Sequence, residues 1–280
     1  MKEDNRVTLR TVVALVVLAG AWGLGGRAGA QEAGESSTKP SAVHIKPKKP
    51  VPTAEAAASV GLNAPETGVI DAPTAAILDY GGYSTLSRFY TQGGFLEYLS
   101  FGVYPRFNLG VSLAINGLIG NERTVRVRPP QVQVKFRFFD GDGTLPALAA
   151  GYDGQGFGYS PGEKLYHDRQ RGFYVVGTQE LGLPGLQAHP SFNISDFDSN
   201  SIFGSIPLSY SIRDKVTVLF EWDNINNFND SRVNSGLRVH LTPNLNADFA
   251  VRRIGQGGSF ADGSPRGPER IVQLKYSGSF

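Results

Sequence analysis

Apolar and polar residues alternate one by one along most of the chain from Ala75 onward. In one window Val132, Val134, Phe136 and Phe138 are separated by polar or charged neighbours. Successive side chains of a β-strand point to opposite faces, so such a window gives one apolar face and one polar face. Helical spacing fits none of these windows. The pattern recurs at residues 109–116, 216–223, 236–241 and 245–252.

This alternation predicts an all-β fold, an antiparallel transmembrane β-barrel of about twelve strands. An even strand number brings both ends of the barrel to the same rim. The expected strands begin near Ala75, Gly94, Asn108, Gln131, Leu145, Gly172, Gly185, Ser201, Lys215, Arg232, Leu245 and Arg270.

A soluble β-sandwich would show the same alternation with its apolar face turned inward. Strands of about ten residues, connections of alternating length and aromatic residues near the segment ends favour a barrel in lipid instead. We expect tight turns at residues 104–107, 140–143, 182–185, 213–214 and 242–244, and longer loops at 120–129, 154–169, 224–231 and 255–267. The aromatic residues of the expected girdle are Tyr90, Tyr104, Phe107, Phe138, Phe139, Trp222 and Tyr276.

The last alternating segment carries a further signal. Val272, Leu274, Tyr276 and Phe280 fall on one face, and Phe280 is the final residue. A terminal Phe behind alternating apolar residues resembles the signal by which bacterial barrel proteins are recognised for insertion. We therefore expect Leu274, Tyr276 and Phe280 to act as an insertion signal. The expected partners are outer-membrane lipid and the barrel-insertion machinery.

The N-terminal part has the pattern of a secretory signal peptide. Lys2, Arg6 and Arg10 precede an apolar run at residues 12–24, and residues 28–30 supply small side chains for cleavage. The run is too short and too rich in Gly to favour a membrane anchor helix. We expect the mature chain to be exported to the bacterial outer membrane.

Residues 31–67 lack the alternation and are rich in Pro, Lys and Ala. Such a segment buries too little apolar surface to offset its ordering entropy, so it is predicted to be a disordered periplasmic linker. The predicted organisation is therefore a signal peptide at 1–30, a linker at 31–67 and an outer-membrane barrel at 68–280.

Composition narrows the chemistry further. The formal net charge of the 280 residues is only +2, so no strong field attracts nucleic acid, and we expect no such partner. The chain has no Cys, which excludes thiolate catalysis and Cys-held zinc. We expect no cofactor and no metal.

Charged residues of the alternating windows fall on the face opposite the apolar one. A basic residue facing lipid at the bilayer midplane costs about 2–4 kcal/mol, so these side chains are expected to line the lumen. Two interpretations stay open: the charges pair across the lumen into a closed network, or they line a narrow wet channel for polar or anionic solutes. The set comprises Lys135, Arg137, Glu221, Asp223, Arg238, His240, Asp248, Arg252 and Lys275.

Two short motifs invite chemical interpretations. His189, Ser191 and Asn193 fall on one face of a strand, as the triad of an outer-membrane phospholipase would, but their apolar neighbours turn that face to the lumen. The turn at residues 140–143 resembles half of a calcium loop whose remaining ligands are absent, so turn chemistry explains it better. We therefore expect no enzyme and assign no catalytic residue.

Residues 68–75 (GVIDAPTA), 135–137 (KFR), 145–149 (LPALA) and 151–158 (GYDGQGFG) resemble segments of the YjbH-like family of outer-membrane proteins. The resemblance covers about residues 68–159 and implies an outer-membrane barrel associated with exopolysaccharide production. It implies a non-enzymatic protein that assists polysaccharide secretion or envelope organisation, with polysaccharide as a partner. The alternatives are a small passive pore for polar or anionic solutes and an outer-membrane lipid-modifying enzyme.

Overall fold

The computed structural model describes residues 64–120, 125–142, 144–160, 165–168, 172–196, 201–260, 263 and 266–280. The expected signal peptide and residues 31–63 of the expected linker lie outside the described residues. In the described part of the chain, no helix combines the length and the apolar character needed to cross a membrane.

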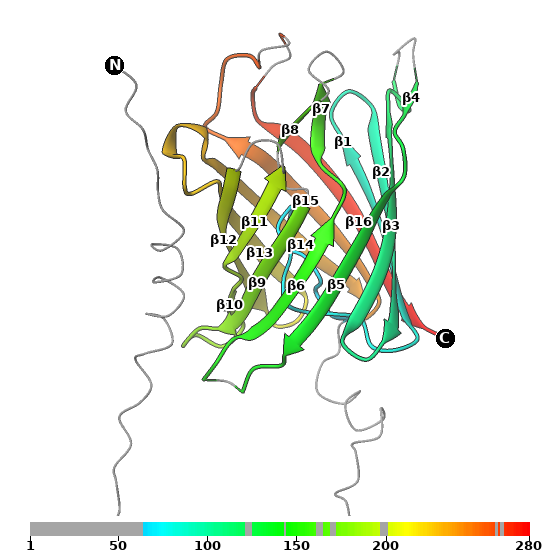
Figure 1. Cartoon of the computed structure of the whole chain (residues 1–280), viewed down its shortest axis with the longest axis vertical. Coiled ribbons are helices and arrows are strands. Elements are labelled where there is room, and N and C mark those ends of the chain that lie inside the picture. Colours follow the sequence, from blue (N-terminus) through cyan, green and yellow to red (C-terminus); the bar gives the residue numbers. More distant parts are fainter. Residues whose placement is uncertain are drawn as a thin grey trace, which may run out of the picture. The chain divides into compact units, whose positions relative to one another are not determined.

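Antiparallel strands form a closed 12-strand barrel, as the alternation predicted (Figure 1). The barrel strands are β1 (Gly82–Tyr90), β2 (Gly94–Tyr104), β3 (Phe107–Asn116), β5 (Gln131–Phe139), β6 (Ala147–Asp153), β9 (Gly172–Glu180), β10 (Leu186–Ala188), β11 (Ser191–Asp196), β12 (Ser201–Ile212), β13 (Val216–Asp223), β14 (Arg232–Thr242), β15 (Leu245–Ile254) and β16 (Glu269–Ser279). β10 and β11 act as one strand, because both lie between β9 and β12. β1 pairs with β16 and closes the ring.

The expected tight turns and the expected longer loops lie at opposite rims, although a connection of three residues, 91–93, joins β1 to β2 at the long-loop rim. The tight turns and both ends of the barrel lie at one rim, at the bottom of Figure 1, and the longer connections lie at the other. Arg213 and Asp214 have φ values of 51° and 54°, which suits a two-residue hairpin turn. Asp142 accepts N–H groups of Thr144 and Leu145 at 3.0 and 2.8 Å, which confirms turn chemistry there. The longer connections carry β4 (Arg126–Val127), β7 (Phe157–Ser160), β8 (Leu165–Asp168) and η2 (Phe228–Asp230).

The first strand differs from the prediction, because it begins at Gly82 rather than near Ala75. The chain lies inside the barrel up to Leu78 and joins β1 only after Asp79 passes closely over β2. The Gly81 N–H donates to the Gly102 carbonyl at 2.9 Å. A Cβ on Gly102 would lie 1.9 Å from the Asp79 carbonyl oxygen, so this crossing requires a residue without a side chain.

The apolar faces of the strands point outward. Phe136, Phe220 and Leu274 keep 46%, 38% and 42% of their surface exposed, whereas their inward neighbours Glu221 and Gln273 are buried. This polarity is the reverse of that in a soluble sandwich, which would pack the same Phe and Leu side chains in a dry interior. The outer surface is therefore suited to hydrocarbon and the inner one to polar contacts.

A cluster of aromatic side chains lies at the tight-turn rim. The rings of Tyr276 and Phe280 lie 6.1 and 5.1 Å from that of Tyr83 at the tight-turn rim. The expectation for Tyr90 was wrong: it points inward, and its hydroxyl donates to Asn116 Oδ1 at 2.5 Å. Tyr90 shares the inward face of β1 with Arg88, since the two positions differ by two.

Candidate functional site

The lumen is occupied by the chain itself. Residues 65–78, here called the plug segment, enter at the tight-turn rim, where the Ala64 N–H donates to the Pro243 carbonyl at 2.9 Å. The segment then reverses in a turn closed by an antiparallel bridge between Gly68 and Pro73. The Val69 N–H donates to the Ala72 carbonyl at 3.0 Å within that turn. The plug segment thus runs into the barrel and back out by the same rim.

Glu221 of β13 binds the tip of this turn. Its Oε1 accepts the backbone N–H groups of Ile70, Asp71 and Ala72 at 2.6, 2.9 and 2.9 Å. Its Oε2 accepts the Asn234 side-chain amide at 3.0 Å. Three successive N–H groups directed at one carboxylate form an anion-binding nest, so a buried wall carboxylate fixes the plug backbone.

The Asp71 side chain makes the second attachment of the tip. Its Oδ1 pairs with Arg88 Nη1 at 2.7 Å, and its Oδ2 pairs with Arg252 Nε at 2.5 Å. Arg88 also donates to the Ile70 carbonyl at 2.5 Å. Each carboxylate oxygen therefore meets a different guanidinium group, one from β1 and one from β15.

Cations of the wall bind carbonyl oxygens of the plug segment lower in the lumen. Arg238 Nη2 donates to the Val69 carbonyl at 3.0 Å. Lys135 Nζ donates to the carbonyls of Thr67 and Ala76 at 2.9 and 3.0 Å, and thereby holds both arms of the segment. Lys275 Nζ donates to the Pro65 carbonyl at 3.0 Å. These contacts satisfy backbone acceptors that the plug cannot pair within a regular element.

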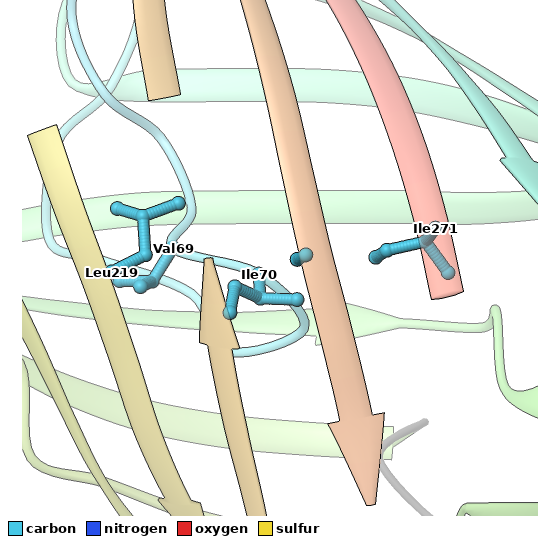
Figure 2. Packing of buried hydrophobic residues seen from close by; sticks show 5 residues of the cluster. Val69, Ile70, Leu219 and Ile271 are labelled. Carbon is cyan, nitrogen blue, oxygen red and sulfur yellow. The ribbon is translucent and has the colours of Figure 1, made fainter. Parts of the chain in front are cut away.

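Apolar contacts join the plug segment to opposite sides of the barrel. Figure 2 shows Val69 and Ile70 beside Leu219 of β13 and Ile271 of β16, in a cluster of buried side chains. Ala75 packs in a separate cluster with Ala149 of β6 and Val176 of β9. The plug therefore spans the lumen from one wall to the other.

The long-loop rim also contributes to closure. Phe157, where β7 begins, lies with its ring centroid 4.3 Å from the Arg88 guanidinium and 4.8 Å from that of Arg252. Asp168 of β8 pairs with Arg252 at 2.6 Å and with Arg232 at 3.0 Å. This connection, expected to be an external loop, thus turns inward over the plug tip.

A cavity of about 190 Å³ remains beside the plug segment. Its wall includes Tyr98, Gln133, Tyr174 and Asn193, from strands on the side of the barrel where Ala75 packs. The plug therefore leaves a small space within the barrel rather than filling it.

The predicted lumen set lies largely where the alternation placed it. Glu221, Asp223, Arg238, Asp248, Arg252 and Lys275 are buried inside the barrel. The sequence left open whether Arg137, Arg238 and Arg252 meet carboxylates or water, and in the structure each of them pairs with carboxylates. The partners are the following: Asp140 for Arg137; Asp248 and Glu66 for Arg238; Asp71, Asp168 and Glu269 for Arg252.

Two members of that set differ in setting. Arg137 lies at the tight-turn rim, where its Nε is 2.9 Å from Asp140 Oδ1. The ring nitrogens of His240 lie 3.0 Å from Thr217 Oγ1 and 2.9 Å from Asn246 Oδ1. Neither Arg137 nor His240 contacts the plug tip through these bonds.

Asp223, another member of the predicted lumen set, lies near the plug tip on β13. Its Oδ2 is 3.7 Å from Arg232 Nη2 and accepts the Asn234 side-chain amide at 3.2 Å.

The site residues missed from the sequence include Asp71, Arg88, Asp168 and Glu269. Asp71 and Asp168 lie outside the regular alternation. Arg88 lies on β1, whose inward face mixes Leu86 with Ser84 and whose outward face holds Thr85 and Ser87. The hydroxyls of Thr85 and Ser87 donate to Glu97 on the outer surface. A strand with no consistent apolar face gives no signal of which side is inward.

His189 and Ser191 point inward, as their apolar neighbours predicted. The ring nitrogens of His189 lie 3.0 Å from Thr178 Oγ1 and 3.0 Å from Ser209 Oγ, while Ser191 Oγ lies 2.6 Å from Ser205 Oγ. Each side chain has other hydroxyl partners, so they do not form the hydrogen-bonded nucleophile and base of a hydrolase.

Asp71, Glu221 and Asp223 bring carboxylate oxygens within 4.8 Å of one another, in a geometry open to a cation. Guanidinium groups already bind Asp71, and backbone N–H groups bind Glu221. Guanidinium and backbone N–H donors therefore already stabilise these carboxylates, which is the role that a bound cation would otherwise play.

The expected insertion signal lies on the outer surface. Leu274 and Tyr276 are 42% and 40% exposed, and Phe280 is 91% exposed beyond the end of β16. All three side chains are thus accessible from the membrane side of the barrel wall.

No protein-family model matches the sequence, and no curated protein matches it. Solved structures of channels resemble it at low identity. The KdgM porin is 9% identical, with 71% of this chain and 99% of that chain covered and a TM-score of 0.43. The NanC porin is 10% identical, with 71% and 99% covered and a TM-score of 0.40. The outer membrane channel DcaP of Acinetobacter baumannii is 8% identical, with 71% and 96% covered and a TM-score of 0.29. The likeness concerns the barrel architecture alone.

Proposed function

We propose that this chain is a non-enzymatic β-barrel of the bacterial outer membrane whose lumen is closed by its own plug segment. The observation that carries the proposal is the double attachment of the plug tip, by Glu221 to its backbone and by Arg88 and Arg252 to Asp71. The apolar outer surface supports insertion in lipid, because strands with buried charges inside and exposed apolar residues outside are unstable in water.

Conductance of the purified full-length chain in planar bilayers tests the closure. We expect the wild type to pass almost no current and a variant lacking residues 65–78 to form conducting pores. A deletion of equal length at residues 40–53 is the matched control and should remain closed. An open wild type, or a plug deletion that conducts no better than the control, would refute the proposal.

We propose further that the closed barrel assists secretion of extracellular polysaccharide or organises the envelope around it. The support is that the segments resembling YjbH-like proteins converge in the lumen. Residues 68–75 form most of the plug, Lys135 binds both of its arms, and Phe157 covers the guanidinium groups that hold its tip. Exopolysaccharide yield after gene deletion and complementation tests this role. Unchanged yield in the deletion strain would contradict it.

A small passive pore for polar or anionic solutes is the second candidate. The observation in its favour is the cavity of about 190 Å³, with Gln133 and Asn193 in its wall, that the plug segment leaves beside itself. The same bilayer recording decides between the two, because a passive pore conducts with the plug in place. A lipid-modifying enzyme is less well supported, since His189 and Ser191 are buried in the lumen, away from lipid.

A further inference from the structure

Arg88 and Arg252 form a two-pronged anion site inside the barrel. Their guanidinium groups take one oxygen each of the Asp71 carboxylate, at 2.7 and 2.5 Å, and both groups lie under the ring of Phe157. Charge-assisted hydrogen bonds from guanidinium groups hold carboxylates strongly, and the face of an aromatic ring attracts the guanidinium groups.

The wall and β8 fix part of this site independently of the plug. Arg252 Nη1 donates to Glu269 Oε2 and Arg252 Nη2 to Asp168 Oδ2, both at 2.6 Å. These bonds leave Nε for Asp71. Loss of the plug would therefore leave Arg252 oriented, with its Nε directed into the lumen.

We infer that Asp71 is an internal ligand of this site, and that a solute carrying a carboxylate opens the barrel by taking its place between Arg88 and Arg252. The inference rests on the proposed function, since it assumes that the plug closes the lumen. Within that function it identifies the solute as acidic, such as an acidic sugar unit.

Charge pairing explains why an anion is needed. Removing one partner of a buried ion pair is strongly destabilising, because the other charge remains desolvated. Departure of Asp71 would leave the Arg88 guanidinium in that condition, whereas Arg252 keeps its pairs with Asp168 and Glu269. An incoming carboxylate replaces the lost partner, so the exchange keeps the charge balance, whereas a neutral sugar of the same size cannot replace it.

Glu221 supplies the restoring force in this scheme. It loses three backbone N–H donors when the tip leaves and retains the Asn234 amide at 3.0 Å. A buried carboxylate that has lost hydrogen-bond donors carries a free-energy cost, and this cost is relieved when the donors return. The plug should therefore close again once the solute has passed.

Bilayer conductance with glucuronate and with glucose tests the inference, since these two sugars differ mainly by the carboxylate. We expect glucuronate to raise the open probability of the wild type at least about ten-fold over glucose. Arg88→Gln should abolish this difference, and Arg106→Gln, at the exposed pair with Asp140, should preserve it. Asp71→Asn should lower the glucuronate concentration for half-maximal opening, because the internal competitor is weakened.

A second measurement follows the plug directly. In an Ala72→Cys variant, glucuronate should speed labelling by a water-soluble thiol reagent, and glucose should not. If the two sugars act alike while the deletion of residues 65–78 conducts, the inference is refuted and the plug proposal stands. If that deletion does not conduct, the proposed function fails instead.

Discussion

Glu221 accepts the backbone N–H of Asp71 with both carboxylate oxygens, at 2.9 and 3.1 Å. The two residues are separated by 150 positions in the chain. Asp71 is itself acidic, so the contact joins two residues of like charge through the backbone of one and the side chain of the other. Arg88 and Arg252 make this possible because they bind the Asp71 carboxylate. The backbone N–H of Asp71 thus faces the negative charge of Glu221, whereas its side chain faces the positive charges of Arg88 and Arg252.

Replacing the acceptor should loosen the plug tip. We expect Glu221→Gln to lower the free energy of unfolding by about 2–3 kcal/mol, because an amide presents donors as well as an acceptor to the buried N–H groups. Urea titration in lipid vesicles measures this change. Glu180→Gln is the control: Glu180 accepts one N–H, from Gly185, at an exposed turn, so it should lose less than about 1 kcal/mol. Equal losses in the two variants would contradict the role of Glu221.

Because the chain contains no Cys, a cysteine introduced into the plug would be the single thiol and could be labelled selectively. Ala72 is 5% exposed in the lumen, whereas Thr144 is exposed in a turn at the rim where the plug enters. We expect a cysteine at position 72 to react at least about ten-fold more slowly than one at position 144, because reaction requires local opening. Comparable rates in the folded barrel would show that the lumen is open.

The barrel could be predicted because strand alternation is a local property of the sequence. Glu221 and Arg238 were placed in the lumen correctly, since each lies next to an outward apolar residue, Phe220 and Leu237. Strands were also expected to begin where several do, at Gly94, Gln131, Gly172, Ser201, Arg232 and Leu245.

The partners of these charges could not be predicted in the same way. The plug segment has no repeating pattern, and its contacts depend on where a closed barrel brings distant strands. Asp71 therefore carried no signal that it would meet Arg88 and Arg252. A row of lumen-facing charges was visible in the sequence, but the chain segment that binds several of them was not.

The outward orientation of the apolar face predicts a specific cost. Phe249, on β15, is 55% exposed, and Tyr80, before β1, is 72% exposed. We expect Phe249→Lys to lower the free energy of unfolding in vesicles by about 2–4 kcal/mol, because the ammonium group would face hydrocarbon. Tyr80→Lys, outside the barrel strands, should change it by less than about 0.5 kcal/mol. If Phe249 faced water, both substitutions would be nearly neutral.

Asp168 lies on β8, outside the barrel strands. It should make the free energy of unfolding depend on pH in the acidic range. Burial alone would raise the pKa of its carboxyl, but Arg232, Arg252 and Arg253 outweigh burial and lower the pKa from 3.8 to about 2. A lowered pKa in the folded state means that the carboxylate stabilises fully above about pH 4 and that this contribution is lost as the pH falls through about 2. We therefore expect Asp168→Asn to lower the free energy of unfolding at pH 7 by on the order of 2 kcal/mol, and the gap to the wild type to shrink towards pH 2. Urea titrations at both pH values measure the gap, and a gap that stays constant would contradict the ion pairing of Asp168.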